Sequence, residues 1–362
     1  MKLNIWFDVP SLYYLPQYIP VYEELTSRGH SCSFLLYHQP DFQHLVSSYL
    51  EGEGKDLPVK IINKEVVNDF YAEKAHADWI IFGNDNFTDF DKLPKQTKTA
   101  LLYHGIGVKA CYYTPGLALY DVRFTEGRFR QEQLATMYPK SRFVETGFAK
   151  LDPLAALKKN CTQAFNLEQN GLNSEKPTLL YAPTFYPSSI ELMDKNWPDH
   201  FDDCNIIIKP HFFTYTNKKY HKQRQLLERW SKFNNVYLTT PTEISLLPYM
   251  ATANILISEA SSALFEFAAL DKPVVWLDYL KLRWSYRGPL RYRFEKRMDK
   301  TILPYTGVAA HVTKPGDLER VVRNELRNPC NYSEARKKTT EELIGKVDGE
   351  VSKRIVNYLE GQ

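Results

Sequence analysis

The stretch "ILISEASSALFEFAALDKPVVWLDY", residues 255–279, decides the fold class. Its apolar run Ile255–Ile257 predicts a short buried strand, and an amphipathic helix is expected to begin near Ser261 or Ser262. The run "PVVWLDY" that follows predicts a second strand. A strand, a helix and a strand in this order are typical of a parallel sheet with a crossover helix.

Short apolar runs alternate with polar helical stretches in both halves of the chain. Further strands are predicted at "LNIWFDV" (3–9), "HSCSFLLYH" (30–38), "ADWIIFGN" (77–84), "KTALLYHGIG" (98–107), "RFVETGF" (142–148), "TLLYAPTF" (178–185), "NIIIKPHF" (205–212) and "NVYLTT" (235–240). We therefore expect an α/β protein with two doubly wound, Rossmann-like domains that face a cleft. The expected parts are an N-terminal domain (1–155), a polar linker (156–177), a second domain (178–345) and a C-terminal helix (346–362) that packs back across the domains.

The composition narrows the class of protein. A net charge of +3 over 362 residues is too near balance to indicate nucleic acid, so we expect no nucleic-acid partner. The five cysteines are scattered without a CxxC pair, which indicates neither a disulfide framework nor a zinc site. The amino terminus lacks the apolar core of a signal peptide, and no stretch approaches the ~18 apolar residues of a membrane span. A cytoplasmic protein, soluble or peripheral to the membrane, is expected.

Groups that bind anions follow several predicted strands. Ser261 and Ser262 can cap the first helical turn, whose N–H groups and positive dipole end also form a phosphate site; capping without a ligand is the alternative. Thr184, Lys209 and His211 stand at two other strand ends. Such donors could hold a pyrophosphate as charge grows on the departing phosphate. We therefore expect no metal and no cofactor, because nothing in these loops resembles a DxD metal-binding motif or a Walker A loop.

A histidine follows another predicted strand, in "LLYHGIGVK" (101–109). The glycines allow a tight turn that presents the imidazole of His104 at the cleft, where it could deprotonate a hydroxyl group. A hydrogen bond from His104 to a nearby loop, without catalysis, is the alternative.

A basic segment, "KLRWSYRGPLRYRFEKRMDK" (281–300), interleaves Lys and Arg with aromatic side chains. We expect it, and Arg287 and Arg291 in particular, to contact a polyanionic acceptor or the anionic inner face of the plasma membrane. Grooves for single-stranded nucleic acid have a similar composition, and a solvated loop without a partner is the other alternative.

Five motifs in this order resemble those of the CDP-glycerol glycerophosphotransferases of teichoic acid and capsule synthesis. The motifs are "YHGIGVK", "ETGFAKLD", "LLYAPTF", "IIIKPHF" and "LISEASSALFEFAALDKPVVWLDY". That family is similar to GT-B glycosyltransferases, with an acceptor domain followed by a CDP-alditol domain. The resemblance implies that His104 is the general base and that Gly105 and Lys109 complete its loop. It implies a CDP-pyrophosphate cradle formed by Thr184, His211, Ser261 and Ser262.

The chain departs from the family pattern at two motifs. The family loop usually has a tryptophan before His-Gly-Thr-Pro, whereas Tyr103 precedes His104 here and Ile106 and Gly107 follow. The acidic residue before the paired serines is commonly an Asp followed by Tyr, and here it is Glu259, which we include among the expected substrate-binding residues. These changes bear on which donor and acceptor are used.

The predicted function is the transfer of glycerol phosphate, or a related alditol phosphate, from CDP-glycerol to a hydroxyl of a capsule or teichoic-type polymer or a lipid-linked glycan. A GT-B glycosyltransferase that uses a nucleotide sugar is the first alternative. A non-catalytic polyanion-binding protein on the same fold is the second.

Overall fold

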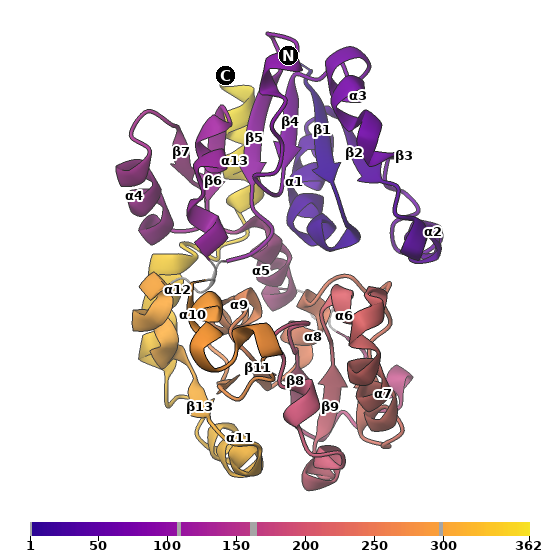
Figure 1. The fold of residues 1–362 in the computed structure, drawn as a ribbon, viewed down its shortest axis with the longest axis vertical. Coiled ribbons are helices and arrows are strands. Elements are labelled where there is room, and N and C mark those ends of the chain that lie inside the picture. The colour runs from indigo at the N-terminus through magenta and orange to yellow at the C-terminus, as the bar shows by residue number, and fades with distance from the viewer. Residues whose placement is uncertain (1, 107–109, 160–164, 297–299) are drawn as a thin grey trace. The chain divides into compact units, whose positions relative to one another are not determined.

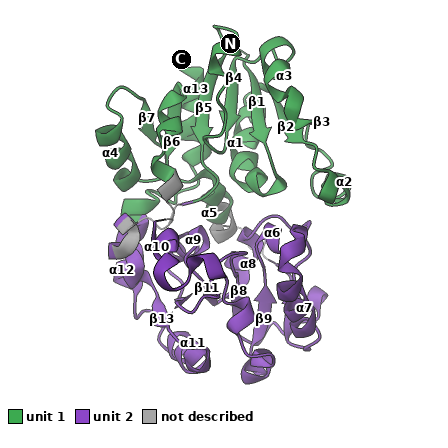
Figure 2. Ribbon diagram, in the orientation of Figure 1, with its two compact units in different colours: residues 1–105, 112–156, 341–362 green, residues 106–111, 157–340 purple. Residues whose placement is uncertain are grey.

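The computed structural model describes residues 2–106, 110–159, 165–296 and 300–362. The chain forms two compact units (Figure 2). Unit 1 contains residues 1–105, 112–156 and 341–362, and unit 2 contains residues 106–111 and 157–340.

Unit 1 is built on a seven-stranded sheet with the order β3-β2-β1-β4-β5-β6-β7 (Figure 1). Neighbouring strands pair in parallel. The strands are β1 (Asn4–Val9), β2 (Ser31–Tyr37), β3 (Val59–Ile62), β4 (Trp79–Phe82), β5 (Lys98–Leu102), β6 (Val122–Thr125) and β7 (Phe143–Glu145). The helices are α1 (Leu15–Ser27), α2 (Gln43–Glu51), α3 (Val67–Glu73), α4 (Arg128–Met137), α13 (Val351–Glu360) and α5 (Asp152–Lys159), whose last residues 157–159 belong to unit 2.

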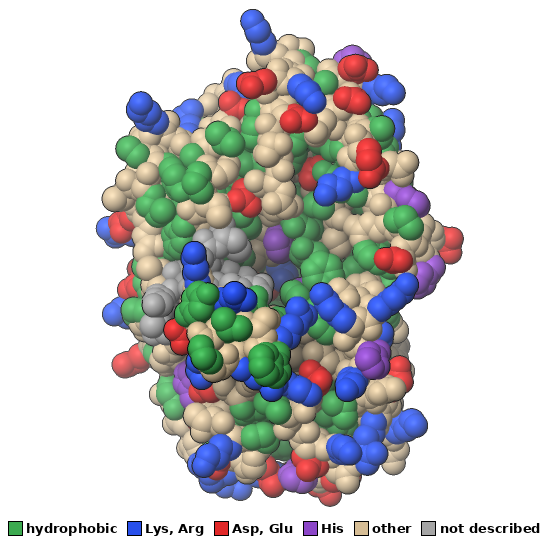
Figure 3. All heavy atoms as spheres, viewed as in Figure 1, with side chains coloured by type: hydrophobic (Ala, Val, Ile, Leu, Met, Phe, Trp, Pro, Cys, Tyr) green, Lys and Arg blue, Asp and Glu red, His purple; other side chains and the backbone are tan. Residues whose placement is uncertain are grey.

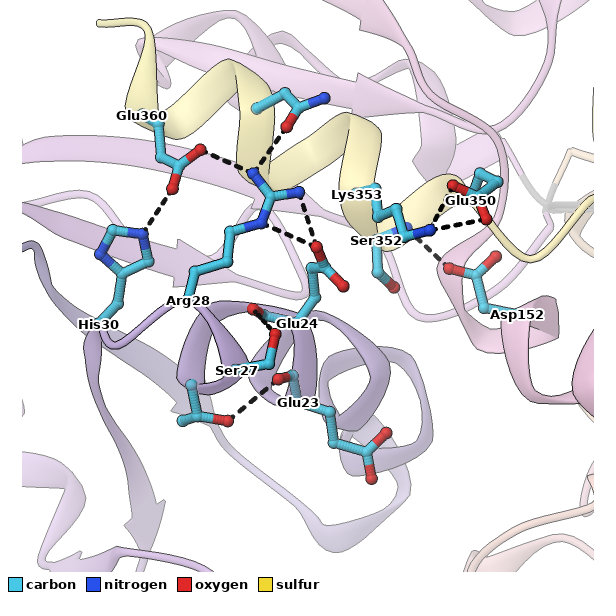
Figure 4. Close-up of polar contacts among 12 residues, drawn as sticks. Glu23, Glu24, Ser27, Arg28, His30, Asp152, Glu350, Ser352, Lys353 and Glu360 are labelled. Carbon is cyan, nitrogen blue, oxygen red and sulfur yellow. Dashed lines mark hydrogen bonds and ion pairs between the residues drawn. The ribbon is translucent and has the colours of Figure 1, made fainter.

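The C-terminal helix α13 packs against α1 of unit 1. Arg28, just after α1, pairs with Glu24 of α1 at 2.6 Å and with Glu360 of α13 at 2.7 Å (Figure 4). At the other end of α13, the carboxylate of Asp152 accepts hydrogen bonds from the N–H groups of Val351 and Ser352, which the first turn of a helix leaves without partners. The last helix is thus held to unit 1 at both of its ends.

Unit 2 is built on a six-stranded sheet with the order β10-β9-β8-β11-β12-β13, and its neighbouring strands also pair in parallel. The strands are β8 (Thr178–Tyr181), β9 (Asn205–Ile208), β10 (Val236–Leu238), β11 (Ile255–Ser258), β12 (Val274–Leu277) and β13 (Ala310–Val312). The helices are α6 (Phe212–Thr216), α7 (His221–Trp230), α8 (Leu247–Thr252), α9 (Ser262–Ala268), α10 (Tyr292–Glu295), α11 (Leu318–Arg327) and α12 (Ser333–Leu343), which ends after the chain has returned to unit 1.

The apolar runs form the strands because parallel strands are covered on both faces and need apolar side chains throughout. Every residue of β8, β9, β11 and β12 is buried. In the polar stretch expected to be a linker, Phe165 packs its ring on Tyr237 and Tyr249 at 4.7 and 5.1 Å, so this residue belongs to the packing of unit 2.

Each sheet has one point where the strand order reverses, between β1 and β4 in unit 1 and between β8 and β11 in unit 2. Ligands of doubly wound sheets bind outside the carboxyl ends of the strands at such a point. The segments that follow these strands are therefore the expected ligand-binding positions of each unit. Within the described parts of the chain, every helix falls short of the length and apolar character that a bilayer crossing requires.

Candidate functional site

The switch point of unit 2 brings together the segments that follow β8 and β11. These strands are hydrogen-bonded neighbours, with Leu179 opposite Ile255 and Tyr181 opposite Ile257. The loop 182–189 after β8 and the residues 259–262 after β11 consequently leave the same edge of the sheet. Thr184 was predicted from one motif, and Glu259, Ser261 and Ser262 were predicted from another. The fold places them on these two neighbouring segments.

Glu259 connects the two segments. Its Oε2 accepts a hydrogen bond from the N–H of Thr184 at 2.7 Å, and its Oε1 accepts one from the N–H of Ser189 at 2.6 Å. The hydroxyl group of Ser189 also donates to Oε1. The side chain is 1% exposed, and this burial raises the pKa of Glu259 above its ordinary value while the hydrogen bonds oppose the shift. Glu259 therefore holds the 184–189 loop in place, and its direct contact with a substrate stays a prediction.

Both polar hydrogens of Thr184 are donated to other groups of the protein. Its N–H donates to Glu259, and its hydroxyl group donates to the backbone carbonyl of Pro187. Ser258, at the end of β11, donates its hydroxyl hydrogen to the carbonyl of Ala182 at 2.6 Å. The contact of 3.2 Å between the hydroxyl oxygens of Ser258 and Ser261 therefore has Ser261 as the donor.

Ser261 and Ser262 are half-buried at the start of α9. Among the described residues, the side chain of Ser261 makes no capping hydrogen bond to an N–H of α9, although its backbone stands at the N-cap position. Capping, the alternative reading of these serines, therefore does not account for the Ser261 hydroxyl group.

His211 follows β9, the neighbour of β8 on the other side. Its Nδ1 accepts a hydrogen bond from the N–H of Phe213 at 3.1 Å, so the neutral imidazole carries its proton on Nε2. Its ring lies 4.6 Å from the ring of Phe185, which belongs to the loop after β8. Lys209 is half-buried directly after β9, and its N–H donates to the carbonyl of Tyr181 at 2.9 Å. The structure thus brings the predicted residues of β9 to the same strand ends.

The described part of the basic segment, residues 281–296, begins beside this loop. The N–H of Lys281 donates to the carbonyl of Ser188 at 3.0 Å, and the N–H of Arg283 donates to the hydroxyl of Tyr186 at 2.8 Å. The guanidinium of Arg283 lies 4.0 Å from the centre of the Tyr186 ring and also donates to the hydroxyl of Tyr220. The segment is therefore anchored at its first residues to the loop that Glu259 holds.

Beyond that anchor the segment is exposed. Arg287 donates to the carbonyl of Leu282 at 2.7 Å, and Arg291 pairs with Glu295 at 3.4 Å. Trp284 is 85% exposed and Tyr292 is 57% exposed, which is unusual for aromatic side chains. Figure 3 shows hydrophobic and basic side chains intermingled over α10.

In unit 1, His104 follows β5. Its Nδ1 lies 3.0 Å from the carbonyl oxygen of Gly83, after β4. A carbonyl oxygen can only accept, so Nδ1 is the donor, and the neutral ring keeps a lone pair on Nε2. The rings of Tyr13 and Tyr14 lie 5.1 and 4.3 Å from the imidazole. The half-buried imidazole therefore has a fixed tautomer with its basic nitrogen opposite the anchor.

The rest of the predicted His104 loop is described only in part. Gly105 is buried directly after His104. Lys109 lies outside the described residues. Gly83 cannot be replaced easily, because a Cβ atom there would lie 2.3 Å from Cδ1 of Tyr14 and 2.5 Å from the hydroxyl oxygen of Tyr18.

One acidic residue of unit 1 was missed by the sequence analysis. Asp8 lies near the end of β1 and is 3% exposed. The hydroxyl groups of Tyr37 and Tyr71 donate to its Oδ1 at 2.7 and 2.8 Å, while burial raises the pKa of Asp8 to about 6. An aspartate at the end of the apolar run "LNIWFDV" was the available signal. In the part of the chain that the structure describes, His, Cys, Asp and Glu side chains form no group of three or more that could hold a metal ion.

Two relatives with assigned names match the chain in sequence. It is 27% identical over 225 residues to the teichoic acid poly(glycerol phosphate) polymerase of Bacillus spizizenii. The aligned residues cover 57% of this chain and 54% of the relative. It is 24% identical over 243 residues to the teichoic acid glycerol-phosphate primase of Bacillus subtilis. This alignment covers 63% of this chain and 55% of that relative. The chain thus spans about half the length of the curated relatives it matches.

Two solved structures share the fold at low sequence identity. The wall teichoic acid polymerase TagF has a TM-score of 0.68 at 15% identity, over 99% of this chain and 88% of the other. A UDP-N-acetylglucosamine 2-epimerase has a TM-score of 0.62 at 16% identity, over 99% and 95%. These likenesses concern the fold alone, and they confirm the predicted GT-B-like α/β class.

A family model identifies the chain more directly. The model for CDP-glycerol:poly(glycerophosphate) glycerophosphotransferases matches residues 118–361, which include the whole of unit 2 from its sheet onward. The resemblance read from the motifs is confirmed by this match. The chain belongs to the CDP-glycerol:poly(glycerophosphate) glycerophosphotransferase family.

Proposed function

We propose that this chain transfers glycerol phosphate from CDP-glycerol to a hydroxyl group of a teichoic-type polymer. The observation that carries the proposal is the fixed tautomer of His104, whose Nδ1 donates to Gly83 and whose Nε2 keeps a lone pair. Family membership supports the donor, because the family is named for CDP-glycerol. The teichoic acid polymerase and primase that the chain resembles support the class of acceptor.

In the proposed reaction, the acceptor hydroxyl oxygen attacks the phosphorus atom that bears glycerol. A new P–O bond forms to the acceptor, the bond from that phosphorus to the bridging oxygen breaks, and CMP leaves. The hydroxyl proton passes to Nε2 of His104. No electron or further reactant is needed, so the step balances with CMP and the lengthened acceptor as its products.

Charge develops on the departing CMP phosphate, and the proposed cradle in unit 2 offsets it. The donors we assign to the pyrophosphate are Lys209, the Nε2–H of His211 and the hydroxyl groups of Ser261 and Ser262. The Ser261 hydroxyl group gives up its hydrogen bond to Ser258 when it donates to the phosphate. Glu259 acts one step away, by holding the loop 184–189. Because these donors include a lysine ammonium, we propose that transfer proceeds without a bound metal ion or cofactor.

We assign the exposed segment 281–296 to the acceptor side of the reaction. Its basic and aromatic side chains suit the phosphates of a polyanionic acceptor, or of an anionic membrane from which a lipid-linked chain grows. Arg287 and Arg291 are the proposed contacts. A cytoplasmic location at the inner face of the membrane belongs to the same proposal.

The proposal is tested by incubating the chain with CDP-glycerol and an oligo(glycerol phosphate) acceptor, with and without EDTA. We expect CMP release matched by acceptor extension in both conditions. Extension with a UDP-sugar and none with CDP-glycerol would instead identify a glycosyltransferase. Loss of all extension in EDTA would contradict the metal-free mechanism.

A further inference from the structure

A buried arginine contacts residues on both sides of the His104 turn. Arg123 lies on β6 and is 1% exposed. We propose that Arg123 is a positioning residue for His104: it fixes the strand end that carries the imidazole. The inference rests on the proposed function, in which His104 is the base.

Arg123 makes two contacts that are far apart in the chain but close in space. Its Nη1 donates to the backbone carbonyl of Tyr112 at 3.0 Å, and its guanidinium lies 4.9 Å from the centre of the Tyr103 ring. The rings of Tyr103 and Tyr112 are themselves 4.8 Å apart. The chain leaves unit 1 after Gly105 and re-enters it at Tyr112, so one guanidinium contacts the chain near both points.

Tyr103 is held from a second side. Its hydroxyl group donates to Oδ1 of Asp85 at 3.1 Å, and the hydroxyl of Thr114 donates to Oδ2 of the same carboxylate. Tyr103 directly precedes His104, so fixing its ring fixes the backbone from which the imidazole projects. The hydrogen bond from His104 to Gly83 then sets the ring orientation.

Burying the charged guanidinium of Arg123 is unfavourable, because it removes the charge from water. Packing of the core alone does not require a guanidinium at this position. The carboxylate of Glu126 is 3.9 Å from Nη2 of Arg123, and among the described residues Nε and Nη2 of Arg123 have no hydrogen-bond partner. Burial lowers the pKa of Arg123. An apolar side chain of similar size is often neutral or stabilising at such a site, so a positional role accounts for the guanidinium better than packing does.

The test combines turnover with hydrogen exchange in Arg123→Met and in a matched control, Arg142→Met. Arg142 belongs to the same unit and also lies over a tyrosine ring, that of Tyr358 at 5.2 Å, but it is exposed. We expect Arg123→Met to lower kcat by about 10²-fold, the size of effect that a small misplacement of a catalytic group produces. Affinity for CDP should stay unchanged, and Arg142→Met should match the parent protein.

A double-mutant cycle with His104→Ala separates positioning from a general loss of structure. If Arg123 acts through His104, Arg123→Met should cost less than about threefold once the imidazole is absent. An equal fold-loss in both backgrounds would overturn the proposal. Normal turnover in His104→Ala alone would instead overturn the role of His104 as the base.

Hydrogen exchange tests the positioning role of Arg123 independently of enzymatic turnover. Peptides containing Tyr103 or Tyr112 should exchange faster in Arg123→Met than in Arg142→Met, and unchanged exchange would overturn the proposal. If Arg123→Met fails to fold, Tyr103→Leu replaces it, because this change removes the ring under the guanidinium and leaves the bond to Tyr112. The same loss of kcat is then expected, and unaltered turnover would contradict the inference.

Discussion

The Nδ1 of His104 donates its hydrogen to the carbonyl oxygen of Gly83 across 3.0 Å. This contact decides which nitrogen can accept a proton, because a backbone carbonyl never donates. Gly83 comes at the end of β4 and His104 at the end of β5, two strands paired side by side in the sheet. The tautomer is therefore a product of the strand order, and it leaves Nε2 able to act as a base.

The first prediction is that His104→Ala lowers turnover by about 10²- to 10⁴-fold, the usual cost of losing a positioned base. Affinity for CDP should not change, since the proposed cradle lies in unit 2. His44→Ala, an exposed histidine of α2 in the same unit, is the control. Steady-state kinetics and calorimetry with CDP check both parts. Near-normal turnover would remove His104 from the mechanism.

Removing donors from the proposed cradle should weaken CDP binding instead. Each charge-assisted hydrogen bond contributes about 1.5 to 3 kcal/mol, so His211→Ala should raise the Kd for CDP by about tenfold or more. A double change, Ser261→Ala with Ser262→Ala, should act in the same direction. The control is His221→Ala, an exposed residue of α7. Unaltered CDP affinity in both variants would show that the pyrophosphate is held elsewhere.

Glu259→Gln tests whether the buried carboxylate organises the loop after β8. As a carboxylate, it accepts from the N–H groups of Thr184 and Ser189 on its two oxygens, whereas one end of a glutamine amide is a donor. One N–H would then face an N–H, at a cost of about 1 to 3 kcal/mol in the free energy of unfolding. CDP affinity should fall with it. Urea unfolding and calorimetry measure the two effects, with the exposed Glu228→Gln as the control. Unchanged stability would contradict this role.

Asp8 should give the stability of the protein a pH dependence of unusual sign. Its pKa is raised from 3.8 to about 6 in the folded chain, so the folded state binds the proton more tightly than the unfolded state does. The free energy of unfolding should therefore fall as the pH rises through this interval, by about 3 kcal/mol in total.

Asp8→Asn should remove this dependence, because an asparagine oxygen can still accept from Tyr37 and Tyr71 but carries no charge to bury. Denaturant unfolding between about pH 4 and pH 7 measures it, with the exposed Asp56→Asn as the control. If the free energy of unfolding changed with pH equally in the parent protein and in Asp8→Asn, Asp8 would ionise near its ordinary pKa.

The sequence predicted the central strands well, and the strands it missed have physical reasons. The missed strands β3 and β13 are short outermost strands, and a polar residue interrupts each of their runs, Lys60 in β3 and His311 in β13. Edge position alone is not the reason, because β7 and β10 are also outermost and were predicted. The third missed strand, β6, contains Arg123, and a buried charge interrupts the pattern by which buried strands are recognised. Strand order was not derivable from periodicity, because every run looks alike.

In the candidate site, the sequence predicted which residues follow the strands, whereas their hydrogen-bond partners became known only from the structure. Residues at strand ends could be named because polar groups stand out after apolar runs, as Lys209 and His211 do. The hydrogen-bond partners of a side chain could not be read from the sequence: the carboxylate of Glu259 accepts from backbone N–H groups of the neighbouring loop, while its predicted contact with a substrate stays a prediction. Ser189, which completes that contact, carried no signal in the sequence.

The last prediction concerns the exposed basic segment. Arg287→Gln with Arg291→Gln should reduce use of a polyanionic acceptor much more than it reduces binding of CDP. The loss should shrink as salt rises, because charges at the surface are screened beyond a Debye length of about 8 Å at physiological ionic strength. Extension assays with an oligo(glycerol phosphate) acceptor at several salt concentrations measure it. The control, Arg320→Gln with Arg327→Gln, removes the same charge from exposed positions on α11.

The outcomes of that experiment separate the partners of the segment. A loss with the soluble oligomer assigns the arginines to the acceptor chain. A loss seen only when the acceptor is presented on vesicles with anionic lipids assigns them to the membrane surface. Equal losses for acceptor use and for CDP binding would place Arg287 and Arg291 at the pyrophosphate. Turnover equal to that of the control pair at every salt concentration would leave the segment as a solvated loop, and the proposed role would be wrong.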